Sequence, residues 1–210
     1  MNTKFLTTAV VLAFSLSTGA QASLVARTGD MVYDTVNNIT WAADANLAKT
    51  SGYDTDGKMT WAAAVAWADQ LTLGGFEDWS LPTTVSPVIG YNQTGSQMGN
   101  LFYNQLGGVA VSGFPTTHND NYNLFKNIQS NVYWSGNEYV LSTISAWNFN
   151  TSTGHQGDFN FKNYSFYAWA VRPGDVAASA PAAVPLPAAT WLFLSGLVGV
   201  LGLNRRKNIG

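Results

Sequence analysis

The chain has 210 residues and a formal net charge of −2, and it contains no cysteine and only two histidines. This composition excludes thiol catalysis, zinc sites with cysteine ligands and metal sites that need several histidines. Between residues 23 and 175, twelve acidic side chains are balanced by only six basic ones, which gives a formal charge of −6. So acidic a segment is not expected to bind nucleic acid or an anionic membrane surface.

The first 22 residues have the three-part pattern of a secretory signal peptide. Lys4 supplies a positive charge, residues 9–14 are apolar, and Ala20-Gln21-Ala22 is an A-x-A cleavage pattern. The apolar run is short for a membrane span. We therefore predict that residues 1–22 are removed on export and that the mature protein begins at Ser23.

The first elements of the mature chain are a predicted hairpin and a helix. Two runs of strand-forming residues, 31–34 and 39–41, flank a pair of asparagines that is typical of a tight turn. Further on, apolar residues recur at helical spacing from 60 to 71. Thr60 can cap this helix, and Gly74-Gly75 ends it.

A second helix and a group of strands follow. Ser96 can cap a helix that ends at Gly107-Gly108, and residues 109–131 are rich in Asn, Gly and Thr, as in a long loop. Short alternating aromatic runs then indicate β-strands at 133–134, 146–149, 159–161 and 167–171. The pattern predicts an α+β fold with two early helices and a late antiparallel sheet.

The C-terminal end has the composition of a linker followed by a membrane segment. Residues 176–183 are mostly alanine and form a predicted flexible linker between residues 23–175 and the tail. Residues 184–203 carry no charge and are long enough to cross a bilayer as a transmembrane helix. The basic cluster Arg205, Arg206 and Lys207 would remain in the cytoplasm. A plain tail anchor is one interpretation of this segment.

The other interpretation is a sorting signal, because the tail resembles the PEP-CTERM family in its Val-Pro-Leu-Pro-Ala variant. The proline motif, the apolar span and the basic end occur in the family's order. The motif residues are Val184, Pro185, Leu186, Pro187 and Ala188. The resemblance implies anchoring in the inner membrane, cleavage by an exosortase-type peptidase, and then release or attachment at the cell surface. It also implies a Gram-negative producer of extracellular polysaccharide.

Four ordered motifs in the mature domain resemble the DUF1566 family, also called the Lcl C-terminal domain. These motifs are residues 54–61, 78–83, 133–139 and 167–174. The second, Asp78-Trp79-Ser80-Leu81-Pro82-Thr83, resembles the signature Asp-Trp-Arg-Leu-Pro-Thr, with Ser80 in place of the usual arginine. The resemblance implies a mixed fold similar to that of C-type lectins. It also implies kinship with adhesins, since some members bind sulfated polysaccharides.

Asp54-Thr55-Asp56-Gly57 resembles the start of a calcium loop, with alternating carboxylates before a glycine that allows a sharp turn. A complete EF-hand would need a glutamate at the position of Ala63, so this is not an EF-hand. Two interpretations stay open. Asp54 and Asp56 either ligate calcium or form a polar turn before the next helix.

No catalytic constellation emerges from the sequence. The nucleophile elbow G-x-S-x-G is absent, and the carboxylates of Glu77, Asp78 and Glu138 are most simply structural or solvated. The expectation is a protein that is not an enzyme.

Aromatic residues divide into core and surface candidates. Most tryptophans fall in the motifs or on presumed buried faces, and we interpret them as core: Trp41, Trp61, Trp79, Trp134, Trp147 and Trp169. Loop tyrosines and asparagines are better candidates for ligand contacts: Tyr91, Asn92, Asn121, Tyr122 and Tyr164. The calcium-lectin motifs Glu-Pro-Asn and Trp-Asn-Asp are absent, so a lectin-like fold brings no sugar mechanism with it.

The sequence therefore predicts an exported, surface-sorted binding protein without enzymatic activity. The expected ligand is a neutral or mildly acidic extracellular polysaccharide, because a charge of −6 repels highly sulfated chains. One alternative is a structural component of the extracellular matrix without its own ligand. The third hypothesis is a hydrolase that acts on exopolysaccharide.

Overall fold

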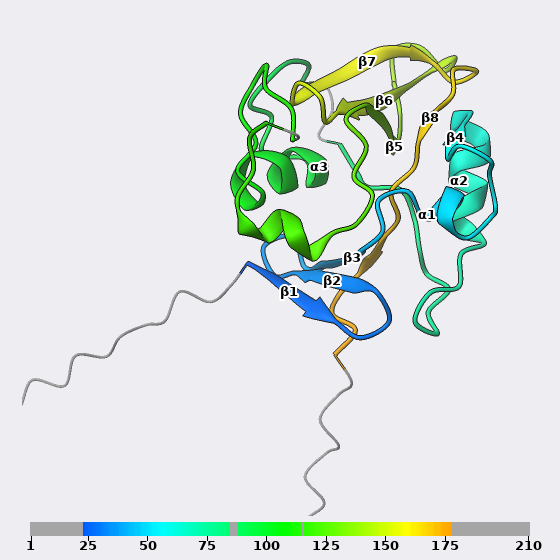
Figure 1. Ribbon diagram of the computed structural model, residues 1–210. Helices are drawn as coiled ribbons and strands as arrows, with labels where there is room; N and C mark the ends of the chain where they lie inside the picture. The colour runs from blue at the N-terminus through cyan, green and yellow to red at the C-terminus, as the bar shows by residue number, and fades with distance from the viewer. Residues whose placement is uncertain (1–22, 85–87, 115, 178–210) are drawn as a thin grey trace, which may run out of the picture. The chain divides into compact units, whose positions relative to one another are not determined.

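The hairpin predicted near the start of the mature chain begins the first of two sheets. The computed structural model describes residues 23–84, 88–114 and 116–177 (Figure 1). The chain divides after Asp175 into two units, and all helices and strands described lie in the first of them. The signal peptide predicted at 1–22 and the tail predicted at 184–207 lie outside the described residues.

The first sheet is antiparallel and joins both ends of the domain. Its strands are β1 (Leu24–Arg27), β2 (Met31–Asp34), β3 (Ile39–Ala42) and β9 (Val171–Pro173), in the order β1-β2-β3-β9. The predicted hairpin is confirmed as β2 and β3, and Asn38 takes a φ of 51° in its turn. An ion pair between Arg27 and Asp175, with a shortest N–O distance of 2.6 Å, fastens the last residues to the first strand.

The second sheet contains the aromatic strands. They are β4 (Lys58–Met59), β8 (Phe166–Tyr167), β5 (Val132–Glu138), β6 (Ser145–Asn150) and β7 (His155–Phe161), in the order β4-β8-β5-β6-β7. All four predicted aromatic runs supply strand residues, but a single late antiparallel sheet is the wrong description. The sheet is mixed, because β5 and β8 are parallel. The last run also divides, with β8 in this sheet and β9 in the first, so that Trp169 lies between strands.

Both predicted helices are present, but only the first is a regular α-helix along its length. The described helices are α1 (Leu47–Thr50), α2 (Trp61–Asp69), α3 (Gln97–Gly99), the π-helix η1 (Asn100–Gln105) and the 3-10 helix η2 (Asp120–Leu124). Thr60 caps α2 as predicted, since its side chain accepts a hydrogen bond from the Ala63 N–H. Ser96 likewise caps α3, which continues as η1 rather than as a regular α-helix. Neither β1 nor α1 was predicted.

A close approach explains the glycine between α3 and η1. A Cβ atom at Gly99 would collide with the backbone carbonyl oxygen of Gln93, so only glycine fits. The Leu106 N–H then bonds to the Leu101 carbonyl, five residues back, as in a π-helix. Leu101 and Phe102 in this wider turn are buried, and the Phe102 ring packs on Phe149 of β6.

The core is aromatic, as the sequence predicts for a domain without disulfides. The predicted core tryptophans are buried, with the exception of the half-buried Trp61: Trp41, Trp79, Trp134, Trp147 and Trp169. Trp169 contacts Trp41 and Phe125 edge-on, with ring centroids 5.2 Å apart in both pairs. Every strand pairing among the described residues falls between Leu24 and Pro173, within the first compact unit, so residues 23–175 contain all the partners that these strands use.

Candidate functional site

The signature segment, residues 78–83, joins the two sheets. Ser80 exchanges two backbone hydrogen bonds with Val171 of β9, with N–O distances of 2.8 and 2.9 Å. The Pro82 carbonyl accepts a hydrogen bond of 3.0 Å from the Gly136 N–H in β5. The signature is thus a brace between β9 and β5, which gives it a structural task.

Asp78, at the start of the signature, is held by an arginine from β9. Arg172 donates from Nε and Nη2 to the two carboxylate oxygens of Asp78, at 2.7 and 3.0 Å. Its guanidinium carbon lies 4.0 Å from the ring centroid of Phe76. The hydrogen bond from Arg172 outweighs the effect of burial and holds the pKa of the Asp78 carboxyl below its ordinary value. Asp78 is therefore occupied as the anion of a structural ion pair.

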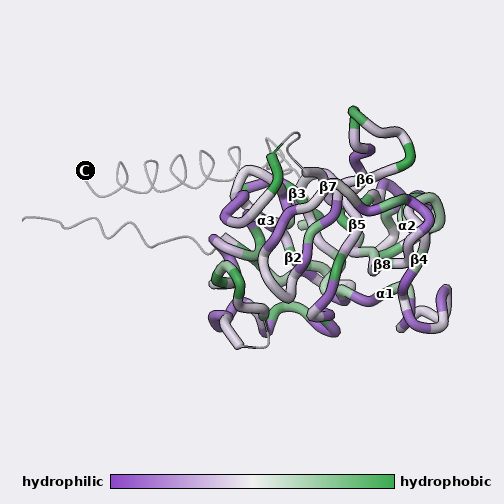
Figure 2. Tube along the Cα trace, turned by 90° about the horizontal axis from the view of Figure 1, so that it is seen from above, coloured by the Kyte–Doolittle hydropathy of each residue, from purple (hydrophilic) through white to green (hydrophobic). Residues whose placement is uncertain are grey.

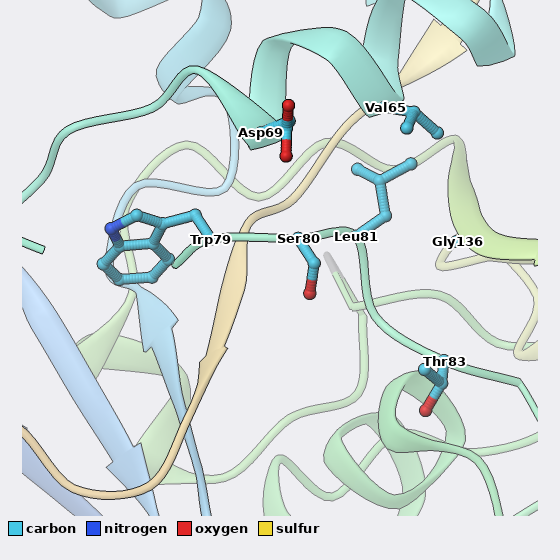
Figure 3. A pocket seen from close by; sticks show the side chains of 7 residues that line it. All are labelled: Val65, Asp69, Trp79, Ser80, Leu81, Thr83 and Gly136. Atoms are coloured by element: carbon cyan, nitrogen blue, oxygen red, sulfur yellow. The ribbon is translucent and has the colours of Figure 1, made fainter. Parts of the chain in front are cut away.

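A shallow groove of about 230 Å³ lies beside the signature (Figure 3). Val65 from α2 and Leu81 face one another across part of its lining in Figure 3. Asp69, the last residue of α2, is also at its wall. Sites for small molecules commonly enclose about 300–1,000 Å³. The groove is smaller than that, and we assign it no ligand.

Asp54 and Asp56 form a hydrogen-bonded turn between α1 and β4. Asp54 Oδ1 accepts from the N–H groups of Asp56 and Gly57 at 3.0 and 2.7 Å, and Asp56 Oδ1 accepts from the Lys58 N–H at 3.0 Å. Burial would raise the pKa of Asp54, but the backbone hydrogen bonds together outweigh it and lower the pKa. Over the described residues, no three His, Asp or Glu side chains are grouped so that they could hold a metal ion. The geometry favours the polar turn, and calcium binding stays a prediction.

An aromatic row crosses the end of the domain at the turn between β6 and β7. Its rings, in order, are His118, Tyr122, Phe114, Phe102 and Tyr103, with successive centroids 4.3, 5.6, 4.5 and 4.7 Å apart. The Tyr103 hydroxyl donates a hydrogen bond of 2.7 Å to the Gly154 carbonyl in that turn. Beyond the turn, Tyr91 contacts His155 edge-on at 5.0 Å. We call these seven residues the aromatic row.

The ends of the aromatic row reach the solvent while its middle is buried. Phe102 and Phe114 are each 1% exposed, whereas Tyr91 is 40% exposed. The exposed His118 ring lies almost parallel to the ring of Tyr122, at an angle of 15°. The predicted amides accompany both ends, since Asn92 follows Tyr91 and Asn121 precedes Tyr122. The structure therefore brings four of the five predicted ligand residues to one end of the domain.

Tyr164, the fifth predicted ligand residue, lies at the opposite end of the strands. It follows β7, whose last residue Phe161 pairs with Ser145, while His155 at the other end pairs with Asn150. Six residues of strand at about 3.3 Å each separate the two ends by roughly 20 Å. A single small ligand cannot contact Tyr164 together with the aromatic row.

Two surface features escaped the sequence analysis. His155 was not singled out as a ligand candidate, although it begins β7 and its ring contacts Tyr91. The loop between β5 and β6 exposes three aliphatic residues, Val140, Leu141 and Ile144. Their signal was an aliphatic cluster in a Ser/Thr loop between two strands, a place where polar residues are usual.

The residues predicted for sorting cannot be placed in the fold. The motif 184–188 and the basic cluster 205–207 lie outside the described residues, as does most of the linker predicted at 176–183. In the described ranges, no helix has the length and apolar character needed to cross a bilayer.

Comparison with known proteins identifies the domain. The model of the family described as the Lcl C-terminal domain matches residues 30–172. No curated protein matches the chain. The matched residues cover about two thirds of the sequence and include the signature brace, the aromatic row and Arg172. The chain therefore belongs to the Lcl C-terminal domain family.

Proposed function

We propose that this protein is an exported, non-enzymatic surface module that binds extracellular polysaccharide through the aromatic row. Membership in the Lcl C-terminal domain family supports an extracellular or surface role. The finer features of the proposal are the sugar ligand, sorting by an exosortase-type peptidase and a C-type-lectin-like fold. The pairing of β3, near the start of the domain, with β9 at its end supports the C-type-lectin-like fold.

The observation that carries the ligand proposal is the pair of exposed ring clusters on one end of the domain. A sugar ring has apolar faces that pack on aromatic rings, and hydroxyl groups that bond to amides. Tyr91 with Asn92 supplies this combination at one end of the aromatic row. At the other end Tyr122 lies beside Asn121, whose Nδ2 donates to the Gln105 carbonyl, so Asn121 would bind a sugar hydroxyl through its Oδ1. The two clusters suit a chain of several sugars rather than a single one.

The charge of the domain selects among polysaccharides. A formal charge of −6 over residues 23–175 disfavours highly sulfated chains. Basic side chains do not gather to offset it. Lys126 is paired with Asp30, Lys162 with Glu138 and Arg172 with Asp78, from three different parts of the fold. We therefore favour a neutral or mildly acidic ligand, bound with an affinity of roughly micromolar to millimolar.

Removal of Tyr91, which is 40% exposed, or of the half-buried Tyr122 is expected to weaken polysaccharide binding by about two- to tenfold. The loss of one aromatic contact accounts for this range, at about 0.5–1.5 kcal/mol per contact. The measurement is titration of residues 23–175 with exopolysaccharide from the producing cell, at low and high salt, for Tyr91→Ala and Tyr122→Ala. Tyr164→Ala is the matched control, because Tyr164 is 46% exposed but lies at the other end of β7.

The same titration decides between the three functions. No saturable signal at millimolar sugar would favour a structural matrix component. Shortening of the polysaccharide during incubation would favour a hydrolase. An equal loss of affinity in all three variants would contradict the aromatic row as the site, and tight binding of sulfated chains in high salt would contradict the charge argument.

We further propose that the tail is cleaved near residues 184–188 after its span has inserted in the inner membrane. The order of proline motif, apolar span and basic cluster supports this. Mass spectrometry of the extracellular protein should then find a C-terminus upstream of Trp191. The same spectrum checks the predicted N-terminus at Ser23. Extracellular protein that always ends at Gly210 would overturn the proposal.

A further inference from the structure

The loop between β5 and β6, residues 139–144, projects an uncharged aliphatic tip from the domain. Val140 is 74% exposed, Leu141 78% and Ile144 62%. Figure 2 shows this loop standing out from the body of the domain next to β6, with hydrophobic residues at its tip and along its return. We call residues 139–144 the apolar finger. Exposed apolar residues in such a cluster usually mark a contact surface.

Two aromatic rings stand at the base of the apolar finger. The Lys162 N–H donates a hydrogen bond of 2.9 Å to the Ile144 carbonyl, which ties the end of the finger to the turn after β7. Phe161 and Tyr164 in that turn are 44% and 46% exposed, and their ring centroids are 5.7 Å apart. The surface thus has an order, with aliphatic side chains at the tip and aromatic rings behind them.

The charges next to this surface neutralise each other. Residues 139–144 carry no charged side chain. At the base, Lys162 Nζ lies 2.6 Å from Glu138 Oε1, and the same ammonium lies 4.5 Å from the ring centroid of Trp61. Because Lys162 and Glu138 are paired with each other, moving the finger out of water would not leave either charge without a partner.

We propose that the apolar finger inserts into the interfacial region of a lipid bilayer of low net charge. Aliphatic side chains lower their free energy most in the acyl region, tyrosine favours the headgroup level, and phenylalanine packs at the boundary between the two. The aliphatic tip of the finger would therefore enter the bilayer most deeply, and the aromatic rings at its base would lie closer to the headgroups. The charge of −6 over residues 23–175 selects against anionic lipid, so zwitterionic headgroups fit better.

A second copy of the chain fits this surface less well. An isologous dimer needs a self-complementary patch that is the same on both subunits, and a loop that projects from the body does not present one. The proposal is independent of polysaccharide binding, because the finger and the aromatic row lie at opposite ends of β6 and β7.

The test is flotation of residues 23–175 with phosphatidylcholine vesicles, alone and with a quarter of phosphatidylglycerol. We expect the parent domain to float with phosphatidylcholine and less with the anionic mixture. Leu141→Asp should lower the partition coefficient at least about tenfold, because it places a charge at the inserted tip. Val36→Asp is the matched control, since Val36 is 60% exposed in the turn between β2 and β3 and should leave flotation unchanged.

A dye at the tip reports insertion directly. The chain has no cysteine, so Ser142→Cys provides a single site for an environment-sensitive fluorophore. Its emission should shift to the blue when phosphatidylcholine vesicles are added. Three results would overturn the proposal: a parent domain that stays in solution, flotation that Leu141→Asp does not reduce, or a label that does not respond while the domain floats. A parent dimer that Leu141→Asp dissociates, without vesicle binding, would assign the finger to a second copy and also overturn it.

Crossed controls separate this proposal from the sugar site. Tyr91→Ala should float like the parent, and Leu141→Asp should keep the parent affinity for polysaccharide. A failure of lipid binding therefore leaves polysaccharide binding to be judged separately, and the reverse also holds.

Discussion

Replacement of Trp169 by alanine is expected to lower the free energy of unfolding by about 3–5 kcal/mol. The indole is fully buried where the two sheets meet, and it packs against Trp41, Phe125 and Tyr133. Its Nε1 donates a hydrogen bond of 2.8 Å to the Ala42 carbonyl in β3. The alanine variant loses these contacts, leaves a cavity and orphans a buried carbonyl. Since native domains are stable by only about 5–15 kcal/mol, much of the stability would go.

Urea unfolding of residues 23–175, followed by tryptophan fluorescence, measures this loss, and Trp147 provides a matched comparison. Trp147 is also fully buried, but its indole N–H has no hydrogen-bond partner among the described residues. Trp169→Phe should therefore cost about 1 kcal/mol more than Trp147→Phe, because only the former breaks a hydrogen bond. A Trp169→Ala domain that keeps the parent unfolding midpoint would show that the indole does not fill the core as described.

Replacement of Asp34 by alanine is the second large effect, at about 2–4 kcal/mol, because several donors lose a charged acceptor. Asp34 is fully buried at the end of β2, and its carboxylate collects donors from two parts of the fold. Oδ1 accepts from the Val36 and Asn37 N–H groups at 2.9 and 3.0 Å, and from Gln105 Nε2 at 2.7 Å. Oδ2 accepts from Asn37 Nδ2 at 2.7 Å. Alanine would leave these donors without their acceptor, and the donor from Gln105 is itself buried.

Two further variants, Asp34→Asn and Gln105→Ala, serve as controls because each removes only part of this hydrogen-bond network. Asp34→Asn keeps the shape and one acceptor oxygen but turns an amide NH₂ toward the other donors, so it should cost less than alanine and more than a surface change. Gln105→Ala should remove only the link between the hairpin and η1, and it should cost less than Asp34→Ala. Chemical denaturation of the three variants gives this ranking, and equal stability of Asp34→Ala and the parent would exclude a central role for the carboxylate.

Local patterns were sufficient wherever a short stretch of chain decides its own conformation. The turn at Asn38 and the caps at Thr60 and Ser96 were predicted because each depends on residues within one turn of it. The aromatic runs of β5 to β8 were predicted because alternation along a strand reports its two faces. The core role of Trp41 and Trp169 followed from the same reasoning.

The two candidate sites depend on contacts between residues distant in sequence, which the alternation of residues along a strand does not predict. Tyr91 and Tyr122 lie at the same end of the domain, at the two ends of a row of buried rings. Tyr164 lies at the opposite end of β7. The aliphatic residues 140, 141 and 144 form a visible cluster in the sequence, but only the fold shows that their side chains are exposed. A hydrophobic residue is informative about function only when its environment is known.

By itself, the sequence determined the acidic, cysteine-free character of the domain, its membership in the Lcl C-terminal domain family and its aromatic core. These follow from composition, ordered motifs and periodicity, which are properties of the chain. Only the tertiary structure decided that the last aromatic run serves two sheets, that the signature is a brace, and that the apolar finger and the aromatic row lie at opposite ends. The physical reason is that strand pairing and burial are set by residues distant in sequence, whose meeting no local pattern records.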